Sequence, residues 1–185
     1  LGDGLEYLTT FGGTIYNLAD VAFQSGAPIH SLSFGGSCHD GLGGCVADCE
    51  LPYESFARDA DQAMWDHKDL LLVNAAGNDG DGLICSPPNA VLTPALSKNV
   101  LAAGSVDHGA SAGNVSSFSS RGPVHDGRLK PTLLAQGQSV ISVASNASVT
   151  TPSCETCSLE GTSMSSPTAA GLAALVREYY TAGYH

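Results

Sequence analysis

The chain has 185 residues, of which 43% are hydrophobic, and its 18 acidic against 7 basic residues give a formal net charge of −11 at pH 7. This length suits one domain, 1–185, with a sizeable core. The acidic balance argues against nucleic acid or an anionic membrane as a partner, because both require positive patches. No stretch reaches the roughly 18 consecutive apolar residues of a membrane span.

The first half of the chain predicts helix, strand, helix and strand in that order. Apolar residues recur at helical spacing after Thr14, a good N-cap residue, and Gly26 stands where a C-terminal cap would. We therefore expect a first helix over 14–25. A short strand over 29–33, a second helix over 53–67 and a strand over 70–75 follow.

The strand over 70–75 is apolar without alternation, which is typical of a strand buried on both faces of a parallel sheet. Strand, helix and strand at this spacing form a βαβ unit with parallel strands. Phe34-Gly35 and Gly77-Asn78 should therefore emerge at the same carboxyl edge, where open α/β sheets bind ligands.

In the second half, turn-rich sequence separates two further expected strands, over 100–103 and 140–143. A long helix over 163–180 follows, and its spacing predicts an inward face made by Leu172, Leu175, Val176 and Tyr179. The pattern as a whole indicates an α/β fold with a mostly parallel sheet flanked by helices.

The segment 161–167, Gly-Thr-Ser-Met-Ser-Ser-Pro, places the hydroxyl of Ser163 at the entry to the last helix. Free backbone N–H groups and the helix dipole favour a developing negative charge there, so the position suits a nucleophile. The alternative is an ordinary capped helix, because serine is a good N-cap residue and Pro167 is tolerated in a first turn.

Asn78 follows the apolar strand in a Gly-Asn turn at the expected carboxyl edge. A side-chain amide there can donate a hydrogen bond to an oxyanion. The alternative is an asparagine that tolerates left-handed backbone geometry between Gly77 and Gly80.

The six cysteines are clustered in Gly- and Pro-rich loops, which favours disulfides and a secreted or extracellular protein. Six cysteines allow 15 connectivities, and the sequence does not choose among them. Zinc binding by the first three cysteines with His39 is the alternative, although the spacing matches no ordinary zinc finger. The cysteines are Cys38, Cys45, Cys49, Cys85, Cys154 and Cys157.

Several segments together resemble the subtilisin-type (subtilase) serine peptidases. Segment 161–167 looks like the nucleophile motif of that family, and 75–80 looks like its oxyanion-hole motif. Segments 31–36, 118–123 and 130–137 also match, in the family's order. The resemblance covers nearly the whole chain and implies the carboxyl-terminal part of a subtilisin-like catalytic domain.

The resemblance assigns a role to each candidate site residue. Ser163 would attack a peptide carbonyl, and the Asn78 amide with the backbone N–H of Ser163 would hold the oxyanion. Ser33, Phe34 and Gly35 resemble the strand that binds extended peptide substrate. Ala75, Ala76 and Gly77 resemble the opposite wall of the first specificity pocket, whose small residues would accept a sizeable apolar side chain. Thr93-Pro94 resembles a family segment that commonly has a cis proline.

The aspartate and histidine motifs of the family are absent, and none of the six histidines has the sequence context of the catalytic base. The chain begins at Leu1 without a leader-like segment, so we expect the interior of a longer polypeptide with the triad residues, and a pro-segment, upstream. The alternative is a catalytically inactive relative that serves as a binding or structural module. No cofactor or metal is indicated by the residues, and calcium is implied by the resemblance alone.

Overall fold

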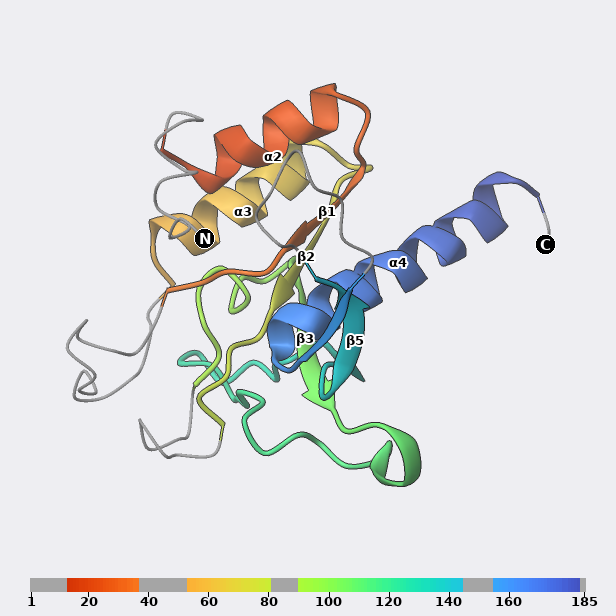
Figure 1. Cartoon of the computed structure of the whole chain (residues 1–185). Helices are drawn as coiled ribbons and strands as arrows, with labels where there is room; N and C mark the ends of the chain where they lie inside the picture. The colour runs from red at the N-terminus through yellow and green to blue at the C-terminus, as the bar shows by residue number, and fades with distance from the viewer. Residues whose placement is uncertain (1–12, 37–52, 81–89, 145–154, 184–185) are drawn as a thin grey trace.

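The computed structural model describes residues 13–36, 53–80, 90–144 and 155–183. These residues form three layers, in which the helices α2 and α3 cover one face of a sheet and α4 covers the other (Figure 1). A separate two-stranded sheet lies beside this body. The helices are α2 (Ile15–Gln24), α3 (Ser55–Asp66), the 3-10 helix η1 (Gly109–Ser111) and α4 (Thr162–Thr181). The strands are β1 (Ile29–Leu32), β2 (Leu71–Ala75), β3 (Leu101–Val106), β4 (Leu133–Gln136), β5 (Val140–Val143) and β6 (Thr156–Leu159).

The main sheet is fully parallel and has the strand order β1-β2-β3-β4. β1 pairs with β2 from Ile29 opposite Leu71 to Leu32 opposite Asn74. Both strands therefore end at the same edge of the sheet, which confirms the expected βαβ arrangement. The fold class predicted from the sequence, a mostly parallel sheet flanked by helices, is also confirmed.

Local sequence signals explain the first helix. The Thr14 side chain accepts a hydrogen bond from the Asn17 N–H at 3.0 Å and so caps α2. Gly26 follows with φ +88°, a conformation that glycine adopts without strain. Buried Ile15 and Ala19 then join a core with residues of α3 and with Leu72 of β2.

The N-terminal half of α4 packs on the other face of the sheet through small residues. Ala169 and Ala170 join a core with Val73 of β2 and Ala103 of β3. Small side chains allow the helix backbone to approach the strands closely. They thereby fix where the start of α4 lies relative to the strand ends.

The C-terminal half of α4 lacks the inward face that its sequence predicts. Leu172, Leu175, Val176 and Tyr179 are exposed, with 62% of Leu175 accessible to solvent. This half of the helix projects beyond the rest of the body (Figure 1). The spacing correctly identified an apolar stripe, but no described residue of this chain covers it.

The small sheet pairs β5 with β6 in antiparallel register, and β6 leads directly into α4. The sequence signals missed β4 and β6, because both are short and mostly exposed. None of the helices in the described part of the chain combines the length and the apolar character needed to cross a membrane.

Candidate active site

Asn78 lies just beyond the carboxyl end of β2, directly against the start of α4. Its Oδ1 atom accepts hydrogen bonds from the Thr162 N–H at 2.8 Å and from the Thr162 hydroxyl at 3.0 Å. With its oxygen held on this side, the amide group Nδ2 of Asn78 keeps its two N–H donors for another partner. Thr162, the neighbour of Ser163, thus fixes the orientation of the Asn78 carboxamide.

Gly161 adjoins two potential oxyanion donors. A Cβ atom built at this glycine would lie 3.5 Å from Asn78 Nδ2, 3.6 Å from Asn78 Oδ1 and 3.7 Å from the backbone nitrogen of Ser163. Gly161 has φ +145°, so its backbone conformation favours glycine. The structure therefore brings the amide of Asn78 and the N–H of Ser163 to the border of one space.

The loop that carries Asn78 is held by the segment 118–123. The N–H of Ser120 donates to the Gly77 carbonyl at 2.9 Å, and the N–H of Gly80 donates to the Phe118 carbonyl at 2.9 Å. The Thr162 hydroxyl also accepts from the Gly77 N–H at 3.1 Å. These bonds satisfy the backbone of the turn and limit its movement.

A second bracing segment reaches the start of α4. The Gly161 N–H donates to the Gly137 carbonyl at 2.9 Å, and the Ser165 hydroxyl donates to the Ala135 carbonyl at 3.2 Å. A Cβ atom at Gly137 would collide with Ser165 and Gly161, so only glycine fits there. The segment 130–137 therefore positions the residues before Ser163.

Ser163 is the second residue of α4, and Gly161 is the N-cap, so Ser163 is not the capping residue. Its hydroxyl contacts the Ser33 carbonyl oxygen at 3.4 Å, and the Ser33 hydroxyl donates to the Ser163 carbonyl at 2.9 Å. Pro167 lies inside the helix beyond its first turn. The end of β1 and the start of α4 are thereby in direct contact.

The two expected walls of a substrate pocket separate beyond the strand ends. Residues 33–35 continue from β1, and the Gly36 N–H donates to the Thr93 carbonyl at 2.8 Å. Residues 75–77 continue from β2, and the Ala76 carbonyl accepts from the Leu92 N–H at 2.9 Å. The Thr93-Pro94 peptide bond is cis, as the resemblance implies.

Leu92 occupies space between these walls. A Cβ atom at Gly35 would lie 3.1 Å from Leu92 Cβ, and one at Gly77 would lie 2.6 Å from Leu92 Cγ. The expectation of a pocket for a sizeable apolar side chain, drawn from the small wall residues alone, did not include this leucine. Leu92 reduces the room that the walls leave.

The described histidines do not contact Ser163. His67 Nε2 lies 2.8 Å from Asp20 Oδ1, and its ring stacks on Phe23 on the α2 and α3 side of the sheet, opposite α4. His30 pairs in register with Leu72 and so faces that same side, and burial lowers its pKa. His108 precedes η1, and His125 is exposed in a loop. Residues His39 and His185 lie outside the described part of the chain.

Cys157 in β6 has a free thiol, and the other five cysteines lie outside the described residues, as does the alternative zinc group around His39. The disulfide prediction therefore stays a prediction. Among the residues that the structure describes, no three metal-ligating side chains are grouped as a metal site would require.

The sequence profile of the Subtilase family matches residues 4–184. The chain therefore belongs to the subtilase family of serine peptidases. Over 81 residues it is 43% identical to "Serine protease/ABC transporter B family protein tagD" of Dictyostelium discoideum, which covers 39% of this chain and 4% of that protein. Over 118 residues it is 34% identical to serine protease AprX of Bacillus subtilis (strain 168), covering 58% of this chain and 26% of AprX.

Solved structures show the same fold. Sphericase superposes with a TM-score of 0.56 and 25% identity, covering 84% of this chain and 44% of that chain. A protein described as S41 psychrophilic protease gives a TM-score of 0.57 and 24% identity, covering 86% of this chain and 47% of that chain. The chain thus spans less than half the length of these solved structures and a smaller share of the curated relatives.

Three residues around the site escaped the sequence interpretation. Thr162 lies inside the recognised nucleophile segment, but only the structure shows that its hydroxyl faces Asn78. Asn74 gave a signal, as a lone amide in an apolar strand. Leu92 gave none, because an ordinary leucine in a loop marks no particular site.

Proposed function

We propose that this chain supplies the nucleophile and the oxyanion hole of a serine endopeptidase. The observation that supports this most directly is the space beside Gly161, which is bordered by the Asn78 amide and the Ser163 N–H. Two donors that border one space can hold a tetrahedral oxyanion with little reorganisation during the reaction. The neighbouring Ser163 hydroxyl is the natural nucleophile for such a site.

In the proposed reaction, Ser163 Oγ bonds to the carbonyl carbon of a polypeptide substrate and its proton passes to a histidine base. The oxyanion accepts hydrogen bonds from Asn78 Nδ2 and the Ser163 nitrogen. The C–N bond then breaks, the departing amine takes the proton from the base, and water hydrolyses the acyl-enzyme ester. An extended substrate would lie along residues 33–35, with the side chain before the scissile bond between the two walls.

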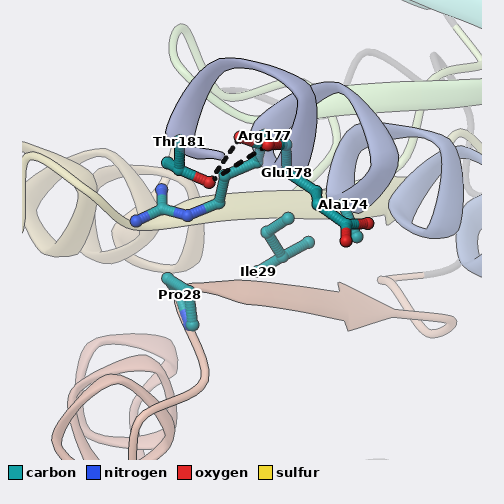
Figure 2. A pocket seen from close by; sticks show the side chains of 6 residues that line it. All are labelled: Pro28, Ile29, Ala174, Arg177, Glu178 and Thr181. Carbon is teal, nitrogen blue, oxygen red and sulfur yellow. Dashed lines mark hydrogen bonds between the residues drawn. The ribbon is translucent and has the colours of Figure 1, made fainter. Parts of the chain in front are cut away.

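The base and its aspartate would come from polypeptide outside these 185 residues. The first support is the edge position of β1, whose outer side pairs with none of the described strands. The second is the exposed apolar half of α4. A hollow of about 340 Å³ lies between the start of β1 and α4 (Figure 2), and it is lined by Pro28, Ile29, Ala174, Arg177, Glu178 and Thr181.

Figure 2 shows the Ile29 side chain directed from β1 toward α4, where the Thr181 hydroxyl donates to the Arg177 carbonyl at 2.9 Å. The apolar surface on this half of α4 lacks a cover from the described residues. We propose that the remainder of the catalytic domain, upstream in the polypeptide, covers this surface. A secreted location with disulfide-bonded loops also remains part of the proposal, on the cysteine pattern alone.

The experiment compares the isolated chain with the full polypeptide that contains it, using a fluorogenic peptide substrate. We expect the isolated chain to show no appreciable turnover and to unfold without a cooperative transition. The full polypeptide should hydrolyse the peptide, and Ser163→Ala should abolish this activity. Turnover that survives Ser163→Ala, or a full polypeptide without any turnover, would contradict the proposed function, and the second result would favour an inactive relative.

Asn78→Ala in the full polypeptide tests the oxyanion hole separately. Loss of such an asparagine in subtilisin lowers kcat by about 10²–10³, which sets the expected scale here. The KM should change little, because the interaction forms chiefly in the transition state. An increase in KM of similar size, with kcat unchanged, would instead assign Asn78 to substrate binding.

A further inference from the structure

Asn74 lies at the point where β1 and β2 separate. It is fully buried and is the last residue of β2 to pair with β1, opposite Leu32. Beyond it, β2 stays with β3, because the Ala76 N–H donates to the Ala103 carbonyl at 3.0 Å. The segment that follows β1 turns away from β2, and its Gly36 N–H donates to the Thr93 carbonyl. Asn74 thus marks the start of the gap between the two proposed pocket walls.

The side-chain amide of Asn74 spans that gap. Its Nδ2 atom donates to the Leu32 carbonyl at 2.7 Å and to the Phe34 carbonyl at 2.9 Å. Carbonyl groups two residues apart in extended backbone point the same way, and those between them point the opposite way. Binding these two carbonyls therefore turns the Ser33 carbonyl away from β2, toward Ser163, as the 3.4 Å contact from the Ser163 hydroxyl shows.

This arrangement is costly for a core position. Asn74 Oδ1 is buried and has no hydrogen-bond partner within the described structure, whereas the preceding residues of the strand are apolar. Leaving a buried amide oxygen unsatisfied destabilises a fold by about 1–3 kcal/mol. An apolar residue of similar size would avoid that cost but would remove the donors of the Leu32 and Phe34 carbonyls, so the asparagine at this position is tied to those two hydrogen bonds.

We propose that Asn74 is a positioning residue for peptide substrate. Its two donated bonds fix the wall 33–35 relative to the wall 75–77, which begins at the very next residue. It thereby sets both the direction of the substrate-binding backbone groups and the width of the pocket around Leu92. This inference rests on the proposed peptidase function, because it assigns a role within the same site.

The test uses Asn74→Leu and Asn74→Asp in the full polypeptide, with Ser116→Ala as the control. Leucine has a similar size and lacks both donors, while aspartate keeps the shape and loses the amide donors. Ser116→Ala also removes a buried hydrogen bond, between the Ser116 and Ser105 hydroxyls at 2.8 Å, but this bond lies at β3 and not between β1 and β2. The control therefore reports a general loss of packing or polar pairing.

Two rates are compared for each variant. One is kcat/KM for a peptide, and the other is the rate at which methanesulfonyl fluoride, a reagent without a group to fill the pocket, modifies Ser163. We expect peptide kcat/KM to fall about 10- to 100-fold, mainly through KM, because displacements near 1 Å can cost that much. The modification rate should stay within about twofold, and Ser116→Ala should change neither rate by more than about twofold.

Unchanged peptide turnover in both Asn74 variants, or an equal fall in both rates, would overturn the proposal. If the unmodified protein shows neither turnover nor modification of Ser163, the proposed function fails, and amide hydrogen exchange decides the positioning role by itself. Faster exchange of the Gly36 N–H in the Asn74 variants than in Ser116→Ala would support wall positioning, and equal exchange would refute it.

Discussion

The hydroxyl of Ser33 replaces a helical hydrogen bond at the carbonyl of Ser163. Pro167 has no N–H to donate to the carbonyl four residues earlier, and Ser33 donates to that carbonyl at 2.9 Å. The same interaction ties the end of β1 to the helix that begins beside the candidate nucleophile. A proline that would otherwise weaken α4 therefore helps to join the two parts of the site.

This relationship predicts a coupling between the two positions. Ser33→Ala should destabilise the full polypeptide by about 1 kcal/mol, because it removes the donor of the Ser163 carbonyl. Pro167→Ala restores a helical N–H, so Ser33→Ala should cost less in that background. Denaturant unfolding of the two single variants and the double variant measures the coupling. Strictly additive free energies of unfolding would show that the Ser33 hydroxyl does not substitute for the helical donor.

Leu92 is predicted to limit the side chain accepted before the scissile bond. Leu92→Ala removes the atoms that lie between Gly35 and Gly77, so the pocket should enlarge. We expect the ratio of kcat/KM for a phenylalanine substrate over an alanine substrate to rise about tenfold or more, in line with the energy of burying a larger apolar group. Leu129→Ala, at an 87% exposed leucine, is the control and should leave this ratio unchanged.

Lys130 is predicted to make stability depend on pH. Burial is the main cause that lowers its pKa from 10.5 to about 8, and its Nζ donates to the Val100 carbonyl at 2.6 Å. The unfolded chain therefore binds more protons than the folded protein between these values, so the free energy of unfolding should rise with pH across this window. The rise has an upper bound of about 3 kcal/mol, and solvent screening reduces it because Lys130 is only partly buried.

Tyr53 works in the opposite direction at higher pH. Burial, followed by its hydrogen bond to Asp61, raises the pKa of Tyr53 to about 12, so its contribution to stability is lost as pH rises above 10.

Chemical denaturation between pH 7.5 and 9.5 measures the contribution of Lys130 to stability below the range in which Tyr53 titrates. Lys130→Met should flatten the slope there, and an unchanged slope would assign it to other groups.

The exposed stripe of α4 provides a direct test of the missing cover. In the full polypeptide, the double variant Leu175→Lys, Val176→Lys should lower the free energy of unfolding by more than about 2 kcal/mol, because it would bury unpaired charges. Leu129→Lys, at a leucine even more exposed in this chain, should change it by less than about 0.5 kcal/mol. Equal effects of the two changes would mean that this half of α4 stays in solvent.

The sequence by itself determined the α/β class, the main helices and the edge of the sheet at which Ser163 and Asn78 meet. Those features depend on local signals: the Thr14 cap, the apolar strand before Asn78, and short segments whose glycines fit one backbone geometry. Such signals act over a few neighbouring residues, so the amino-acid sequence alone reveals them. The short strand β4 gave too weak a pattern because most of its residues are exposed.

Only the tertiary structure decided how distant side chains share the site. The Thr162 hydroxyl on Asn78, the Leu92 side chain between Gly35 and Gly77, and the Asn74 amide on Leu32 and Phe34 all join segments far apart in the chain. The apolar stripe of α4 is a second feature that the sequence alone could not place. Periodicity identifies an apolar face, but whether that face is buried depends on which other segments fold against it.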